Sequence, residues 1–179
     1  MSIDDRLTAL WPKLLPLMLP YEGSASQLYV LDLPLNLLEK TIQIFCKHMD
    51  NAIVTTLNDY TYLLSEAPAC DQNSIDKILK ASEHSMHSII NGLLSKDRSL
   101  SVWIWPDSSQ KTFDVELVFW ADEFFPEGLS KKEHIASFDT LYKLANLFRQ
   151  ELPDCKCVLS SHETGDPRKE LDEAWNVAW

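Results

Sequence analysis

The stretch 101–125 constrains the fold more than any other part of the chain, because apolar side chains recur in it with a period of two. Alternation of this kind places successive side chains on opposite faces of a pleated strand. It runs through residues 102–105 and again through residues 113–120, on either side of a short break. In the break, Pro106 cannot donate a ladder hydrogen bond, and Asp107 and two serines favour a chain reversal. The pattern predicts a β-hairpin.

The two faces of the second predicted strand have different characters. One face is wholly apolar and belongs in a core: Phe113, Val115, Leu117 and Phe119. The other begins with Asp114 and Glu116 and ends with Trp120. If Trp103 and Trp105 lie on that side too, the face combines tryptophan with carboxylate. Each indole buries about 150–250 Å² when covered, so these rings must lie under a helix or await a partner.

Two segments before the hairpin have the apolar spacing of amphipathic helices. Apolar side chains recur every three or four residues through 36–66, and a similar stripe runs through 74–94. The β-branched run at 53–56 leaves open a break within the first segment. Together the two segments predict an antiparallel helical hairpin, which would make residues 1–97 the mainly helical part.

Shorter signals complete the predicted fold. Residues 3–19 predict a short helix that prolines interrupt, and residues 27–33 predict a strand able to join the hairpin's sheet. Ser130 and Glu133 form a capping box that opens a helix, and residues 155–159 follow it as a strand. A right-handed crossover would place this last strand parallel to its neighbour.

The sum of these elements is one α+β domain over residues 1–179. We expect a long N-terminal helical hairpin packed with a small mixed β-sheet and a crossover helix. The sheet consists of the tryptophan-rich hairpin and one crossover strand, so residues 98–179 form the sheet-containing part. A composition of 45% apolar and 24% charged residues is that of an ordinary globular protein.

The net charge of −11 restricts the class of partner. An acidic surface repels nucleic acid and anionic membranes, because contacts with phosphate supply most of the affinity for nucleic acid. A protein partner would be basic. The sequence has no apolar run near the roughly 20 residues of a membrane span, and its acidic start is unlike a signal peptide. The four cysteines then predict reduced thiols and a cytoplasmic protein.

Motifs for cofactors are missing from the sequence. With only four glycines, it contains neither pattern of the glycine-rich phosphate loops, so we expect no nucleotide cofactor. His84 and His87 lie three apart and could share a metal on one helix face. The apolar stripe of that helix turns His84 outward, however, so we expect exposed histidines and no metal.

The leading hypothesis is a non-enzymatic, acidic binding protein, most specifically an immunity-type inhibitor of a basic toxin or enzyme domain in a bacterial cytosol. Its predicted partner-binding residues are Trp103, Trp105, Asp114, Glu116, Trp120, Asp122 and Glu123. They combine acidic steering with aromatic anchors, as expected where a basic protein binds. No catalytic residue is assigned.

Two alternatives remain open. The first is a small-molecule-binding or hydrolase-like enzyme that uses the polar loop 160–163 with the carboxylates of Asp122 and Glu123. Against it, residues adjacent in sequence rarely have triad geometry, and a capped turn explains the same loop. The second is an adaptor subunit whose long helices self-associate. A deep pocket would favour the enzyme. An exposed face of tryptophan and carboxylate would favour the binding protein, and an uncovered apolar helix face would favour the adaptor.

Overall fold

A seven-stranded antiparallel sheet forms the centre of the computed structural model. The structure describes residues 8–9, 12, 25–58, 61–68, 71–95, 98–151 and 156–160. The strands, in chain order, are β1 (Ala25–Pro34), β2 (Asp50–Asn58), β3 (Thr61–Pro68), β4 (Ser88–Ser95), β5 (Arg98–Asp107), β6 (Thr112–Trp120) and β7 (Lys156–Ser160). They lie in the order β3-β2-β4-β5-β6-β1-β7. The mixed α+β class is therefore confirmed.

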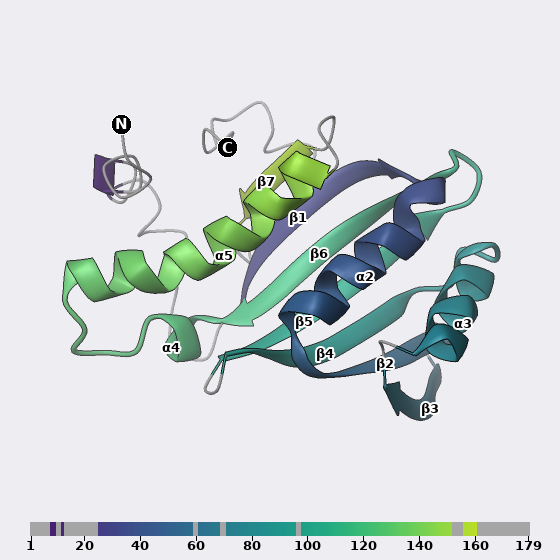
Figure 1. Ribbon diagram of the computed structural model, residues 1–179, viewed down its shortest axis with the longest axis horizontal. Helices are drawn as coiled ribbons and strands as arrows, with labels where there is room; N and C mark the ends of the chain where they lie inside the picture. The colour runs from purple at the N-terminus through teal and green to yellow at the C-terminus, as the bar shows by residue number, and fades with distance from the viewer. Residues whose placement is uncertain are drawn as a thin grey trace.

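The helices gather on one face of this sheet (Figure 1). They are α2 (Leu38–His48), α3 (Gln72–Ser82) and α5 (Lys131–Glu151), with the short η1 (Leu35–Leu37) and α4 (Ala121–Phe124) at strand ends. In the described part of the chain, no helix is long and apolar enough to cross a membrane.

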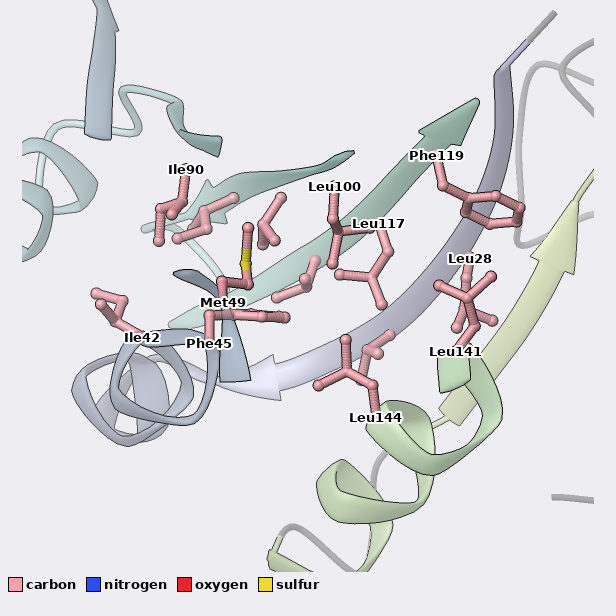
Figure 2. Packing of buried hydrophobic residues seen from close by; sticks show 14 of the residues in the cluster. Leu28, Ile42, Phe45, Met49, Ile90, Leu100, Leu117, Phe119, Leu141 and Leu144 are labelled. Atoms are coloured by element: carbon pink, nitrogen blue, oxygen red, sulfur yellow. The ribbon is translucent and has the colours of Figure 1, made fainter. Parts of the chain in front are cut away.

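The core lies between the three longer helices and the sheet face that they cover. Phe45 of α2, Leu117 of β6 and Leu141 of α5 belong to one cluster of buried apolar side chains (Figure 2). The apolar face of β6 that the sequence predicted is completely inside this cluster. Burial of this face stabilises the fold by about 25 cal/mol per Å² of apolar surface removed from water.

The predicted hairpin is confirmed as β5 and β6. Trp103 is paired with Glu116 and Trp105 with Asp114, so tryptophan and carboxylate share a face as expected. Asp107 stabilises the turn: its Oδ1 accepts hydrogen bonds from the backbone amides of Ser109 and Gln110, at 3.0 and 3.2 Å. The strand predicted at 27–33 is β1, and it pairs with β6.

The predicted helical hairpin is wrong. Residues 36–66 form α2, β2 and β3, and residues 74–94 form most of α3 and most of β4. β-Branched residues at 53–56 favour a strand, and there Val54 is buried while Ile53 is exposed. The apolar residues of this segment fit both the helical spacing and the strand spacing, so its sequence resembled that of one helix. The part before residue 97 is therefore not mainly helical, since it contains four of the strands.

The end of α3 explains why the second predicted helix stops early. The amide of Met86 donates to the carbonyl of Ala81 at 3.0 Å, and Ser85 lies at φ 54°. A left-handed residue followed by an amide that bonds back to a carbonyl five residues earlier is the pattern of a Schellman motif, which ends a helix. After it the chain turns back and enters β4.

The crossover helix is confirmed, but the pairing of the last strand differs from the prediction. The capping box opens α5, with the amide of Ser130 donating to Oε2 of Glu133 at 2.8 Å. β7 then pairs antiparallel with β1, not parallel with β6. β1, from much earlier in the chain, lies between β6 and β7. All pairs are antiparallel, so the sheet is not mixed. The helix predicted at 3–19 lies almost wholly outside the described residues.

A bulge in β2 requires a glycine in its partner strand β4. Asp50 pairs with Leu93 and Ile53 with Asn91, so two residues of β2 face Gly92 alone. A Cβ on Gly92 would lie 2.9 Å from Cε of Met49 and 3.1 Å from the backbone oxygen of Asp50. A larger residue there forces the side chain of Met49 and the backbone of β2 to shift.

Replacing Gly92 by Ala should destabilise the fold by about 1–3 kcal/mol through overpacking, as measured by urea denaturation. Gly128→Ala is the control, because its Cβ would meet nothing within 4 Å but its φ is +84°. It should show only backbone strain, about 1 kcal/mol. Wild-type stability of Gly92→Ala would contradict the close approach.

Candidate functional site

The sheet face opposite α2, α3 and α5 carries the predicted site. Strand register and alternation place on it Tyr29, His87, Ile89, Trp103, Trp105, Asp114, Glu116 and Trp120. We call this surface the aromatic face. The three longer described helices all pack on the other side of the sheet (Figure 1). The described side chains of the aromatic face make several contacts with one another.

Three rings form the centre of the aromatic face. Trp103 and Trp105 stack with ring centroids 5.5 Å apart and planes inclined by 17°. The ring of His87 lies against Trp105 at 4.1 Å. All three are half-buried. Partial burial lowers the pKa of His87 below its ordinary value, because desolvation disfavours the charged imidazolium.

Glu116 is a buried carboxylate beside these rings, with 7% of its surface exposed. Its cross-strand neighbours are Trp103 on one side and Tyr29 on the other. Its Oε2 accepts a hydrogen bond of 2.9 Å from Nε1 of Trp105. A buried carboxylate needs such donors, and a buried indole N–H needs an acceptor. The pair therefore fixes the orientation of the Trp105 ring.

Asp114 has a structural contact of its own. Between Val30 and Leu33, β1 bulges opposite Asp114, and Asp32 has φ 58°. The backbone amide of Asp32 donates to Oδ1 of Asp114 at 2.9 Å. The bulge interrupts the strand ladder here, and the carboxylate of Asp114, instead of a backbone carbonyl, accepts the hydrogen bond of the Asp32 amide. Its negative charge remains at the edge of the aromatic face.

The last three predicted residues surround the end of β6. Trp120 is 45% exposed, which makes it the most exposed large apolar side chain recorded in the described part. Asp122 is exposed on α4. Glu123 is half-buried, and its Oε2 accepts bonds of 2.6 Å from both the amide and the hydroxyl of Ser99. Glu123 therefore stabilises the start of β5, which its predicted binding role did not anticipate.

The structure brings four of the seven predicted residues into one group: Trp103, Trp105, Asp114 and Glu116. Trp120 lies on the same face at the far end of β6, beside Asp122 and Glu123 of α4. Sequence reasoning missed His87 and Tyr29. His87 comes directly before β4, and recognising 88–95 as a strand would have placed it beside Trp105.

The two histidines behind the metal alternative do not share a helix face, and most of the loop behind the enzyme alternative lies outside the described residues. His84 is exposed in the turn after α3 and His87 lies on the aromatic face, so they do not share a helix face. Among described residues, no three His, Cys, Asp or Glu side chains are placed to hold a metal ion. Of the loop 160–163, only Ser160 belongs to a described element, β7, and the rest lies outside the described residues.

Comparison with protein-family models, with curated proteins and with solved structures finds no match for this chain. The arguments about function below therefore come from the side chains themselves.

Removing the Glu116 carboxylate should destabilise the protein by about 1–3 kcal/mol, because the Trp105 indole N–H would lose its acceptor. Glu116→Ala should show this loss in thermal or urea unfolding. Glu116→Gln keeps an acceptor oxygen and should lose less. Combining Glu116→Leu with Trp105→Phe removes both partners and should cost less than Glu116→Ala. If Glu116→Ala and Glu116→Gln are equally stable, the hydrogen bond is not important.

His87 should titrate below 6.5, the ordinary pKa of histidine. In the window between its folded pKa and about 6.5, the unfolded chain binds the proton more readily, so stability should fall as the pH falls. NMR titration of the imidazole ring protons measures the pKa directly. His87→Phe keeps a ring against Trp105 and should flatten the dependence of unfolding free energy on pH in that window. A His87 pKa at or above 6.5 contradicts this.

Proposed function

We propose that this protein is a non-enzymatic binding protein that captures a basic protein on the aromatic face. More specifically, we propose an immunity-type inhibitor of a basic toxin or enzyme domain. The observation that carries the proposal is the stacked pair Trp103 and Trp105, bordered by carboxylates on the sheet face opposite α2, α3 and α5.

The aromatic side chains are suited to anchor a partner. Tryptophan is among the residues that most often dominate binding energy, because it removes a large rigid surface from water at low entropic cost. Trp120 already exposes 45% of its surface. The rings of Trp103 and Trp105 are fixed by stacking and by Glu116, so binding would order few further side chains. A preorganised aromatic surface of this kind supports tight association.

Charge selects the partner. The net charge of −11 gives a long-range field that attracts a basic protein and accelerates its association. Asp114 at the edge of the face and Asp122 beside Trp120 place negative charge close to the anchors. A toxin or enzyme domain that acts on a polyanion has a basic surface, and an acidic binder that covers this surface blocks it. This complementarity supports the inhibitory role.

Affinity capture with matched charge variants tests the proposal. Asp122→Lys and Asp76→Lys each replace an exposed acid by a base, the first beside Trp120 and the second on α3. The immobilised protein should capture a basic protein from the source cell. Asp122→Lys should slow association about tenfold and Trp120→Ala should weaken binding, whereas Asp76→Lys should leave both nearly unchanged. The captured protein's activity should be inhibited at one equivalent.

Equal losses for Asp122→Lys and Asp76→Lys would reduce the effect to overall charge and contradict a role for the aromatic face. An acidic captured partner would contradict the proposal altogether. Unfolding curves of each variant separate lost binding from lost structure.

A further inference from the structure

A hollow of about 310 Å³ opens at the β5–β6 turn, at one end of the aromatic face. Its lining includes Trp105 and Asp107 from β5, Gln110 from the turn, and Thr112 and Asp114 from β6. This volume lies at the lower end of the range for ligand pockets, about 300–1,000 Å³. It suits one large side chain or a small molecule better than a nucleotide cofactor.

The lining of the hollow includes two carboxylates, those of Asp107 and Asp114. Asp114 is directly opposite Trp105, and Asp107 is directly opposite Thr112. Asp107 and Asp114 are therefore diagonal neighbours on one face, for which the usual separation is about 7–8 Å. Negative charge on both groups favours a cation in the hollow.

Hydrogen bonds hold both carboxylates in place. Oδ1 of Asp107 accepts from Ser109 and Gln110, and Oδ1 of Asp114 accepts from the amide of Asp32. The bonds from Ser109 and Gln110 hold the pKa of Asp107 below its ordinary value, so this group stays ionised at neutral pH. The bonds from Ser109 and from the backbone amide of Gln110 all reach Oδ1, and a carboxylate has two oxygens with about four acceptor sites, so Asp107 keeps accepting capacity towards a ligand.

The lining discriminates among cations. Calcium needs about six to eight oxygen ligands around one point, and no three His, Cys, Asp or Glu side chains of the described residues are placed to hold a metal ion. An ammonium is more strongly hydrated than a guanidinium, so it loses more hydration free energy when it leaves water for the hollow. A guanidinium is planar, weakly hydrated and has five N–H donors, so it can lie along an indole and donate to two carboxylates.

We infer that this hollow is an arginine subsite: it receives an arginine side chain of the basic partner between Asp107 and Asp114, against Trp105. The inference rests on the proposed function for the identity of that partner. The recognition of a guanidinium itself can be measured without the partner.

The test is a titration with N-acetyl-arginine amide at low salt, followed by the NMR signal of the Trp105 indole N–H. N-acetyl-citrulline amide, a neutral ligand of nearly the same shape, is the control. The arginine derivative should give a saturable shift and the citrulline derivative should bind at least tenfold more weakly. Equal binding of the two, or no saturable shift with the arginine derivative, would overturn the subsite.

The matched variant is Asp107→Asn/Asp114→Asn, because asparagine keeps the oxygen that accepts the local hydrogen bonds and removes the charge. It should weaken binding of the arginine derivative at least tenfold, with an unfolding curve close to that of the wild type. Asp76→Asn/Glu127→Gln removes the same charge from exposed acids outside the hollow and should leave binding unchanged. Equal weakening by the two double variants would show only an effect of overall charge and would count against the subsite.

The captured partner separates this inference from the proposed function. If Asp107→Asn/Asp114→Asn captures the basic partner as well as the wild type while Trp120→Ala loses it, the subsite is wrong and the aromatic face is right. If the wild type captures no basic protein, the proposed function fails, and the arginine titration still decides whether the hollow recognises a guanidinium.

Discussion

Burial of a single face of the sheet under α2, α3 and α5 is the constraint on which the rest of the structure depends. An antiparallel sheet with helices on one side leaves its other side to water or to contacts among its own residues. Here those contacts are the stacked Trp103 and Trp105, the ring of His87, and the hydrogen bond from Trp105 to Glu116. The same arrangement stabilises the face and prepares it for binding.

Carboxylates on this protein have more than one role. Glu116, Asp114 and Glu123 each accept a hydrogen bond that the local fold needs, respectively from an indole, from a bulged amide and from the start of β5. Their charge still contributes to the field that reaches a partner. Asp122 is exposed on α4, so its clearest role is electrostatic attraction of a basic partner. Treating all four as one binding patch, as the sequence suggested, would confuse folding defects with binding defects.

The sequence predicted the elements whose local signals agree with one another. The β5–β6 hairpin has period-two alternation together with turn residues, and α5 has a capping box followed by an apolar stripe. The strands β2 and β4 were missed because their apolar residues fit both helical and strand periods. Gly92 was the signal that could have decided: in a helix it has no evident purpose, whereas in β4 it is required by the approach of Asp50.

The site was predictable as a set of residue types but not as an arrangement. That Trp103 and Glu116 share a face follows from strand register within a hairpin, which the sequence determines locally. His87, just before β4, and the backbone amide of Asp32 in β1 reach Trp105 and Asp114 through pairings that no local pattern specifies. The contacts of Glu123 with Ser99 likewise depend on how α4 turns after β6.

The position of β1 has a consequence for how the chain folds during synthesis. β1 lies between β6 and β7, yet it is synthesised before both. Until β6 and β7 emerge from the ribosome, β1 can form neither of its native pairings, and an unpaired strand edge invites association with other chains. The β4–β5–β6 meander needs only local pairings and can form first. Closure of the sheet by β1 then needs pairings between residues far apart in the sequence, and pairings of this kind form slowly as a rule.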